Sequence, residues 1–274
     1  MRAILILSLT MIFFGSELFA GGHSSTLQDV KARGKLRCVV TTGLPGFAAP
    51  DANGVWRGFD WDFCRATAAA VFGDANAVDP ITSTGKTRFT KLNAGEGDVL
   101  WRNTTITFSR DVSVKLRFLG VNYYDGQGFM VNKSLGVSSA KELDGASVCI
   151  QTGTTTELNL ADFFSSNNMS YEAVTIETND EARQNYEAGR CDIYTTDASG
   201  LASTRSSLPN PNDHMVLPEI ISKEPLGPAV RQGDDAWADI ITWVLAATIT
   251  AEELGVNSSN VDQMRNSNLS LIHI

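Results

Sequence analysis

Short apolar runs and amphipathic stretches alternate along this chain. Residues 36–40 form an apolar run that predicts a strand, and residues 43–54 are rich in glycine and proline and predict a loop. Residues 60–72 then predict a helix that ends at Gly73. The expected inner face of this helix consists of Phe59, Phe63, Thr67 and Ala70. A strand followed by a helix is the repeating unit of α/β folds.

The same alternation continues further along the chain. Strands are predicted at residues 99–101, 147–151 and 192–195, and helices from about residue 155, at 179–188 and at 235–254. Thr154 and Glu157 have the spacing of a capping box at the start of the first of these helices. Gly189 ends the second helix. The pattern therefore predicts a second α/β unit after the first.

Two segments have the character of connections between separate bodies. Residues 121–131 are rich in β-branched and aromatic residues and contain two glycines, and residues 223–228 are rich in proline and glycine. Two such crossings predict two lobes with a cleft between them. We expect the first lobe to comprise residues 21–122 and 229–274, and the second to comprise residues 123–228.

The N-terminus has the layout of a secretory leader. Arg2 precedes an apolar run at residues 3–14, and Ala20 is a small residue suited to the cleavage site, so residues 1–20 are predicted to be a signal peptide. An uncut leader that serves as a membrane anchor is the alternative. No later window approaches the roughly 18 apolar residues that a membrane-spanning helix requires. The mature chain is therefore expected to be exported.

Charge argues against one class of partner. The 274 residues carry a formal net charge of −9 and contain no basic cluster, so nucleic acid is not an expected partner. The chain also lacks the third glycine of a dinucleotide fingerprint after Gly126 and Gly128, and we expect no cofactor.

Four cysteines in an exported chain predict two disulfides, because the periplasm and the extracellular space are oxidising. Cys38 lies in a predicted strand and Cys64 in the helix that follows it, whereas Cys149 and Cys191 belong to two later predicted strands. We expect Cys38 to pair with Cys64, and Cys149 with Cys191. A metal site is the competing interpretation, but no two cysteines have the short spacing of zinc sites, and the chain has only three histidines.

Three polar blocks, at residues 97–110, 151–157 and 189–197, contain the groups that a zwitterion needs. The first holds a guanidinium that can bind a carboxylate through two parallel hydrogen bonds, and the second is a hydroxyl-rich helix start. The third block ends in the carboxylate of Asp197. Together they predict a site for a free α-amino acid.

Several stretches of the chain resemble one known family, the periplasmic solute-binding proteins of polar amino-acid ABC transporters, and within it the general L-amino-acid-binding branch. The resemblance covers about residues 26–264. The stretches that carry it are residues 42–47, 56–60, 97–110, 123–129, 151–155, 196–200 and 224–227. It implies an α/β fold of the two-lobed, type II periplasmic-binding-protein class with a ligand cleft between the lobes.

The resemblance also implies roles for particular residues. Arg110 would bind the ligand α-carboxylate, and Thr105 would add a hydroxyl and an N–H beside it. The backbone carbonyl of Asn103 would accept from the ligand ammonium. From the second lobe, Thr155 would complete the carboxylate site and Asp197 would pair with the ammonium. The family implies closure of the hinge over an L-amino acid, delivery to an ABC transporter permease at the inner membrane, a periplasmic location and a monomer.

Selectivity is expected to depend on three further residues. Arg88 matches a position that points toward the ligand side chain in relatives specific for glutamate and aspartate, so acidic or amide side chains are favoured. Relatives often stack an aromatic ring on the ligand, but the matching position here is Leu44, with Phe47 nearby. This departure is compatible with a pocket that accepts several side chains.

Simpler interpretations of these residues remain open at this stage. Arg110 could form a surface ion pair with its neighbour Asp111, and Arg88 could be a solvated helix arginine. Asp197 could serve as a turn or cap residue, and the loop at Gly153 could act in capping alone.

Two other functions also remain open. The fold class hosts secreted dehydratases, although the only carboxylate expected in the cleft is already assigned to the ammonium. A domain that senses amino acids for a membrane signalling partner would differ only in that partner. The family continues past the position of Met264, so we expect the chain to be cut short there, with a non-native end at residues 269–274. A short genuine strand at this end is the alternative.

Overall fold

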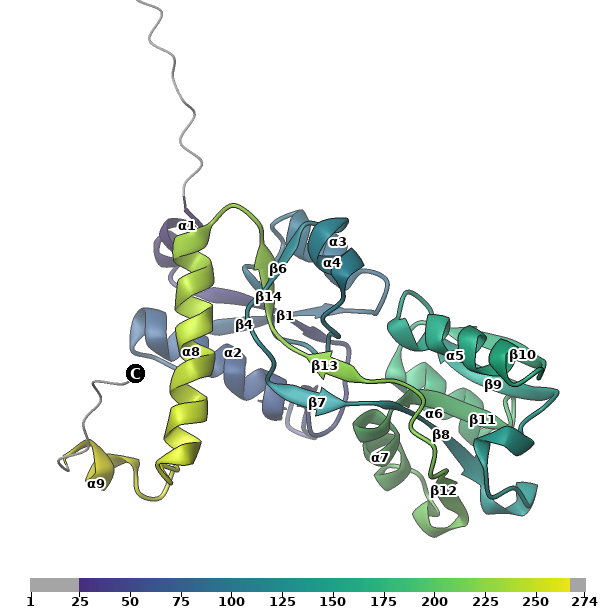
Figure 1. Ribbon diagram of the computed structural model, residues 1–274. Helices are drawn as coiled ribbons and strands as arrows, with labels where there is room; N and C mark the ends of the chain where they lie inside the picture. Colours follow the sequence, from purple (N-terminus) through teal and green to yellow (C-terminus); the bar gives the residue numbers. More distant parts are fainter. Residues whose placement is uncertain (1–24, 267–274) are drawn as a thin grey trace, which may run out of the picture.

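The structure is a computed structural model that describes residues 25–266. It consists of two lobes, each built around a five-stranded sheet, joined by two strands that run side by side between them (Figure 1). The predicted leader at residues 1–20 and the residues after position 266 lie outside the described part.

The first lobe has a sheet in the order β4-β1-β5-β14-β6. These strands are β1 (Leu36–Thr41), β4 (Val78–Ser83), β5 (Val99–Leu100), β6 (Leu116–Phe118) and β14 (Ala229–Arg231). The helices of this lobe are α1 (Thr26–Arg33), α2 (Phe59–Phe72), α3 (Arg88–Asn93), α4 (Phe108–Val112), α8 (Asp235–Glu253) and α9 (Val261–Arg265). β1 is parallel to both β4 and β5, so the carboxyl ends of these three strands meet at one edge. A short hairpin of β2 (Ala49–Pro50) and β3 (Trp56–Arg57) falls within and just after the predicted loop.

The second lobe has a sheet in the order β10-β9-β11-β8-β12. Its strands are β8 (Gln127–Asn132), β9 (Ala146–Gln151), β10 (Tyr171–Ile176), β11 (Ile193–Asp197) and β12 (His214–Val216). Its helices are α5 (Thr155–Ser166), α6 (Asn179–Glu187) and α7 (Ala198–Ser206), with short 3₁₀ turns at Lys133–Leu135, Ala140–Glu142 and Pro211–Asp213. β9, β10 and β11 are parallel, and α5 and α7 begin at their carboxyl ends.

The two crossings between the lobes pair with each other. β7 (Tyr123–Asp125) and β13 (Glu224–Leu226) form an antiparallel ribbon, which we call the hinge ribbon, with Glu224 opposite Asp125. The chain comes close to itself beside the ribbon, since a Cβ on Gly227 would lie 2.0 Å from the carbonyl oxygen of Gly120. Only glycine fits at this approach.

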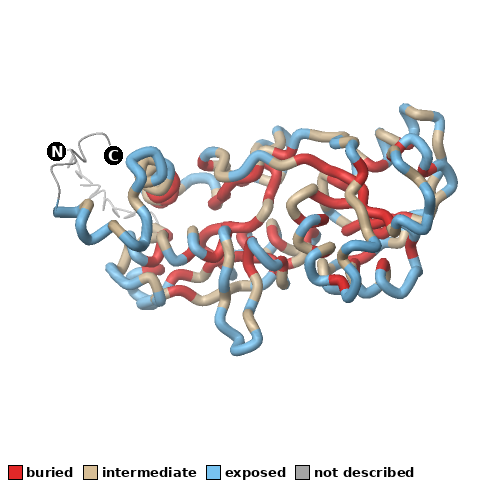
Figure 2. Tube along the Cα trace, turned by 90° about the horizontal axis from the view of Figure 1, so that it is seen from below, coloured by how far each residue is buried: buried red, intermediate tan, exposed pale blue. Residues whose placement is uncertain are grey.

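Each lobe has its own core, and buried stretches of chain run through the middle of both (Figure 2). In the first lobe α2 and α8 cover one face of the sheet. Trp101 and Trp237 are fully buried there, and each indole N–H finds an acceptor, in Thr67 Oγ1 at 3.0 Å and in the Asp98 carbonyl at 2.9 Å. Burial of two such large rings with their polar atoms satisfied fixes the helices on the sheet.

The predicted inner face of α2 is correct in part: Thr67 is buried and Phe63 packs against the core, but the other two residues do not face inward. The buried residues are Asp60, Trp61, Cys64, Thr67 and Ala68, whereas Phe59 and Ala70 are exposed. The helix has aromatic residues on two sides, so its apolar pattern alone does not single out one face. Cys64 must point at β1 to reach Cys38, and this decides the rotation.

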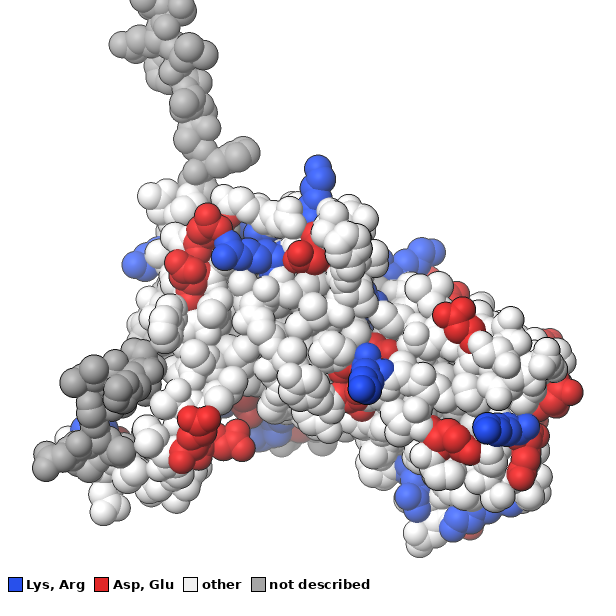
Figure 3. Space-filling view, viewed as in Figure 1, with Lys and Arg blue, Asp and Glu red and all other residues white. Residues whose placement is uncertain are grey.

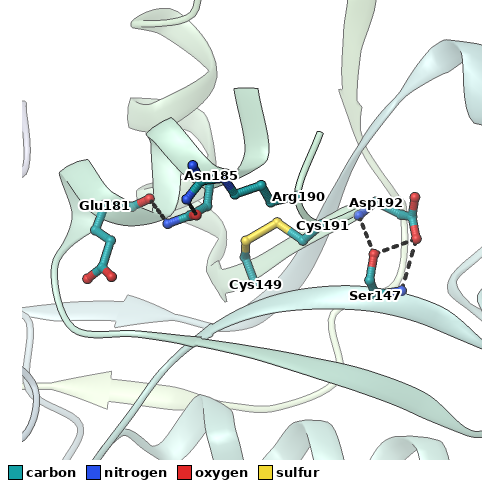
Figure 4. The surroundings of a disulfide bond; sticks show 7 residues. All are labelled: Ser147, Cys149, Glu181, Asn185, Arg190, Cys191 and Asp192. Atoms are coloured by element: carbon teal, nitrogen blue, oxygen red, sulfur yellow. Dashed lines mark hydrogen bonds between the residues drawn. A yellow bond between two sulfur atoms is a disulfide. The ribbon is translucent and has the colours of Figure 1, made fainter. Parts of the chain in front are cut away.

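Both predicted disulfides are confirmed. Cys38 pairs with Cys64 within the first lobe, and Cys149 pairs with Cys191 within the second. Beside the second disulfide, Ser147 and Asp192 exchange hydrogen bonds between the start of β9 and the residue before β11 (Figure 4). Neither disulfide joins one lobe to the other, so neither restrains their relative movement.

The surface agrees with the balance of charges in the sequence. Acidic and basic side chains are interspersed on the face shown in Figure 3, with no single large patch of either sign. Within residues 25–266 no helix combines the length and the apolar character needed to cross a bilayer. The same residues contain no group of three histidine, cysteine or acidic side chains placed to hold a metal ion.

Candidate functional site

A cavity lies where the carboxyl edges of the two sheets face each other. It is narrow, with a volume of about 20 Å³ available to the centre of a water molecule. Residues from both lobes line it: Arg88, Arg102, Asn103 and Thr105 from the first, and Gln151, Thr154, Thr155, Thr156, Thr196 and Asp197 from the second. The carboxyl edge of parallel strands is the usual binding region of α/β sheets, because loops and helix starts converge there.

Arg110 is held rigidly just behind the cavity wall. It belongs to the short helix α4, where the hydroxyl of Thr107 caps the backbone by accepting from Arg110 N at 3.2 Å. The guanidinium Nη1 donates to the carbonyl of Thr105 at 2.7 Å, and the group lies 5.2 Å from the ring centre of Phe89. Arg110 is buried and forms no ion pair with Asp111, so the surface interpretation is wrong. Burial lowers its pKa to about 10, which leaves it charged at neutral pH.

Arg88 supports the loop that follows β5. It is 3% exposed, which excludes the solvated interpretation, and its Nη1 donates to the Asn103 carbonyl and to Thr104 Oγ1, both at 3.1 Å. Burial first, and then the neighbouring Arg102 and Arg110, lower the pKa of Arg88 well below its usual value. The Asn103 carbonyl retains a second lone pair for another donor.

The start of α5 brings hydroxyls and amides to the opposite wall. Thr154 is the N-cap and accepts from Glu157 N at 3.3 Å. The carboxylate of Glu157 accepts from Gly153 N at 3.0 Å, one residue before the position that a full capping box requires. The first amides of a helix have no partner inside it and carry a partial positive charge, so this end of α5 suits an anionic group.

Asp197 ends β11, lines the cavity and forms no ion pair with any residue that the structure describes. It occupies the N-cap position of α7, but its side chain makes no capping hydrogen bond. Burial, followed by the negative charges of Asp125 and Glu224, raises the pKa of Asp197 to about 7, while Arg88 and the amide of Asn103 act in the opposite direction. A positive group placed beside this carboxylate would relieve the unfavourable burial.

A buried carboxylate that the sequence analysis did not assign connects both lobes. Glu224, in the hinge ribbon, is 2% exposed, and its Oε2 accepts from Thr105 Oγ1 at 2.5 Å and from Thr155 Oγ1 at 2.9 Å. Its Oε1 accepts from Asn159 Nδ2 at 2.7 Å and Ser222 Oγ at 2.6 Å. Only the match to the family at residues 224–227 pointed to this segment, and it gave no role to the carboxylate.

Arg102 and Asp60 are a second pair that the sequence analysis did not assign. Arg102 lines the cavity, whereas Asp60, in the first turn of α2, does not. Burial raises the pKa of Asp60 to about 7, and the positive charge of Arg102 opposes this shift. Neither residue has a distinctive neighbour in the sequence, so no local pattern could have indicated that they come together.

Leu44 and Phe47 are placed differently from the other predicted site residues. Both are buried in a small apolar cluster with Leu226 of the hinge ribbon, and neither lines the cavity. Phe47 packs edge to face against Tyr123, with ring centres 5.6 Å apart. The structure thus brings Asn103, Thr105, Thr155, Asp197 and Arg88 together at the cavity, sets Arg110 directly behind it, and gives these two residues a place at the hinge.

The lobes touch each other around the cavity. Asn179 Nδ2 donates to Thr41 Oγ1 at 3.2 Å, and Ser203 Oγ donates to the Pro45 carbonyl at 2.8 Å. Close approach is possible because Gly153 faces Lys86, whose Cα would lie 2.9 Å from a Cβ at that glycine. The cavity is therefore enclosed by two bodies that meet mainly through polar contacts and a two-stranded hinge.

Comparison with known proteins agrees with this architecture. The model of the bacterial extracellular solute-binding proteins, family 3, matches residues 36–257. The chain is 62% identical over 257 residues to the glutamate/glutamine/aspartate/asparagine-binding protein BztA of Rhodobacter capsulatus, covering 92% of this chain and 76% of that one. It is 58% identical over 257 residues to the general L-amino acid-binding periplasmic protein AapJ of Rhizobium johnstonii, covering 92% and 75%.

A solved structure is also similar over most of its length. The ABC transporter / periplasmic binding protein from Brucella ovis with glutathione bound superposes with a TM-score of 0.87 at 54% identity, covering 92% of this chain and 79% of that one. All three relatives are named as binding proteins and none as an enzyme. The chain has the type II periplasmic-binding-protein fold, and it belongs to family 3 of the bacterial extracellular solute-binding proteins.

Proposed function

We propose that this protein captures an L-amino acid between its lobes outside the cytoplasm and presents the closed form to the permease of an ABC transporter. The observation that carries the proposal is the arrangement of charge across the cavity. Arg110 from the first lobe and the start of α5 from the second provide positive potential for a carboxylate, while Asp197 provides a carboxylate for an ammonium. A free α-amino acid carries the two opposite charges that match them.

Contributions from both lobes make closure depend on the ligand. The Asn103 carbonyl and Arg110 belong to the first lobe, and Thr155 and Asp197 belong to the second. A ligand that binds all of them gains its full interaction energy only when the lobes meet, so binding favours the closed form. A permease that recognises the closed form would then receive loaded protein.

The ligand carboxylate would compete with Glu224. Both threonine hydroxyls that the α-carboxylate is expected to use, those of Thr105 and Thr155, donate to Glu224 Oε2 in this structure. A hydroxyl has a single hydrogen to donate, so it cannot serve both carboxylates at once. Binding therefore requires these hydroxyls to turn from Glu224 to the ligand. The positive charge of Arg110 acts on Glu224 and would also attract the ligand α-carboxylate.

The charge balance favours acidic ligands or their amides. Two guanidiniums, those of Arg88 and Arg102, and one carboxylate, that of Asp197, line the cavity. L-Glutamate and L-aspartate carry two carboxylates and one ammonium, which is the complementary set. The name of the 62% identical relative, a glutamate/glutamine/aspartate/asparagine-binding protein, supports the same ligand class.

Glutathione is a second candidate ligand. It is the molecule bound in the Brucella ovis structure, and its γ-glutamyl end carries the same ammonium and α-carboxylate as a free amino acid. An enlarged opening between the lobes would have to accommodate the rest of the tripeptide.

A thermal-shift screen of the protein, unfolded and refolded to remove any bound solute, tests the proposal. The panel holds the twenty L-amino acids, glutathione, D-glutamate and glutarate, which lacks the ammonium. A ligand at 100 times its Kd should add about 2.7 kcal/mol to the free energy of unfolding. We expect shifts from acidic and amide L-amino acids and none from glutarate. A cooperatively melting protein that responds to no compound would contradict the proposal.

The partner and location need their own test. In a bacterial strain that lacks this gene, uptake of the labelled ligand should fall. The signal-peptide prediction requires the mature protein to be recovered from the periplasmic fraction. Its mass in solution should be that of a monomer. Unchanged uptake together with ligand binding would favour the sensing alternative.

A further inference from the structure

Arg102 stands out among the three arginines at the site because its donors are uncommitted. It is the second residue after β5, is 6% exposed and lines the cavity. Its Nε is buried without a hydrogen-bond partner among residues 25–266, as Arg88 Nε also is, but unlike Arg88 it makes no hydrogen bond there through its other nitrogens either. None of the nine ion pairs found in that part of the chain includes it.

The other two arginines are already held by the protein. Arg110 Nη1 is fixed on the Thr105 carbonyl, and Arg88 Nη1 is shared between the Asn103 carbonyl and Thr104. These bonds orient the loop that follows β5. Arg102 makes no comparable bond, although a buried guanidinium without acceptors is costly. Such a group is expected to find its acceptors on a ligand.

Asp60 is a buried carboxylate whose charge acts on Arg102 and opposes the effect of burial on the pKa of that arginine. It is 1% exposed, and Arg102 is the cation that acts on its carboxylate. The two do not form an ion pair within 4.0 Å, so Asp60 supports the charge of Arg102 without occupying its donors. Asp60 is not among the residues that line the cavity.

We propose that Arg102 recognises the polar end of the ligand side chain, and that the buried carboxylate of Asp60 tunes the attraction of this site for anions. The assignment rests on the proposed function, in which Arg110 and the start of α5 take the α-carboxylate, and Asp197 with the Asn103 carbonyl takes the ammonium. Arg102 is then the cavity cation whose donors remain for the side chain. The proposal therefore assigns recognition of the ligand side chain to Arg102, which the sequence analysis did not single out, in place of Arg88.

The chemistry of a guanidinium explains why acids and amides share such a site. Its N–H groups can donate hydrogen bonds either to a carboxylate oxygen or to the carbonyl oxygen of an amide. A carboxylate accepts two parallel bonds and adds charge attraction, so it gains more than an amide does. The negative charge of Asp60 reduces the net attraction for anions, which narrows the difference between glutamate and glutamine.

Calorimetric titration of Arg102→Gln with L-glutamate, L-glutamine and L-alanine tests this assignment. We expect affinity for glutamate to fall about 100-fold and that for glutamine about tenfold, while the affinity for alanine stays within a factor of two. Arg65→Gln, at an exposed position of α2, is the matched control and should change none of the three. An equal loss for all three ligands, or no loss for glutamate, would overturn the assignment.

Asp60→Asn provides a second, independent measurement in case the arginine variant folds poorly. Removal of the counter-charge should raise the ratio of glutamate to glutamine affinity at least fivefold at pH 8, and a ratio that is unchanged or lower would contradict the role of Asp60. Wild-type protein that binds none of the three ligands would contradict the proposed function itself, and this assignment with it.

Discussion

The carboxylate of Glu224 accepts a hydrogen bond from the hydroxyl of Thr155 at 2.9 Å, and this bond joins the hinge ribbon to the second lobe. The same oxygen accepts from Thr105 in the first lobe, so one buried carboxylate bonds to both bodies at the point where they meet. Glu224 is therefore an internal contact of the closed form at the position where a ligand carboxylate is proposed to bind.

Glu224→Gln should make the ligand-free protein more open. Hydrogen bonds to a charged acceptor are worth about 1.5–3 kcal/mol each, and the neutral amide weakens those from both lobes at once. We expect a larger radius of gyration in small-angle X-ray scattering and a return to the wild-type value at saturating ligand. Glu219→Gln is the matched control, because Glu219 accepts from Ser139 and Ala140 within the second lobe alone. Equal radii for both variants would refute the interlobe role.

Arg110→Lys should weaken ligand binding without destabilising the lobe greatly. The lysine keeps the charge but loses the planar fork that binds a carboxylate through two bonds, and it loses the bond to the Thr105 carbonyl. We expect affinity to fall about 10- to 100-fold in calorimetric titration. Arg117→Lys, which alters a largely exposed pair with Asp235, serves as the control and should retain wild-type affinity. Wild-type affinity of Arg110→Lys would place the α-carboxylate elsewhere.

Affinity should rise with pH through about 7. The pKa of Asp197 is raised to about 7 by burial, and only its ionised form can pair with the ligand ammonium. Below this pH the carboxylate must first lose its proton, which lowers the affinity by up to about tenfold per pH unit. L-Glutamine suits the measurement, because its own groups do not titrate between pH 5 and 8. In Asp197→Asn the remaining affinity should vary much less with pH; an equally steep profile would assign the effect to another group.

The ligand-free protein should lose stability over part of the same pH range. The pKa values of Asp60 and Asp197 are about 7 in the folded state and near 3.8 in the unfolded chain. Between these values the folded state binds more protons, so the free energy of unfolding falls as pH rises from about 4 to about 7, by up to about 1.4 kcal/mol per pH unit for each group. Urea denaturation of wild type and Asp60→Asn checks this; the variant should show a shallower decline.

Removal of the second disulfide should separate stability from binding. Cys149 and Cys191 are 42 residues apart and lie away from the cavity lining. The double variant Cys149→Ala/Cys191→Ala should lose about 2–4 kcal/mol of unfolding free energy. Its ligand affinity, measured well below the melting temperature, should stay within a factor of three. A large loss of affinity in a folded variant would show that the disulfide orients the site.

Local patterns in the chain were sufficient for the order of elements and for the cysteine pairing. Apolar runs of strand length, glycines at helix ends and two connecting segments predict two α/β bodies, because burial of one face dictates these periodicities. Arg110 and Asp197 could be predicted because they stand in motifs at the ends of elements, where the polar groups of a site gather. The rotation of α2 could not be predicted, since aromatic residues on two of its sides made the pattern ambiguous.

Which charged side chains are buried could be learned only from the tertiary structure. Asp60, Arg102 and Glu224 come from three distant segments, and each resembles an ordinary surface residue in its local sequence. Their roles depend on loss of water and on the charges that the fold places around them, and both are properties of three-dimensional distance. Sequence by itself therefore determined the two-lobed scaffold and indicated the residues proposed to bind the two ends of the ligand, whereas the packing of the lobes determined which charges face one another across the cavity.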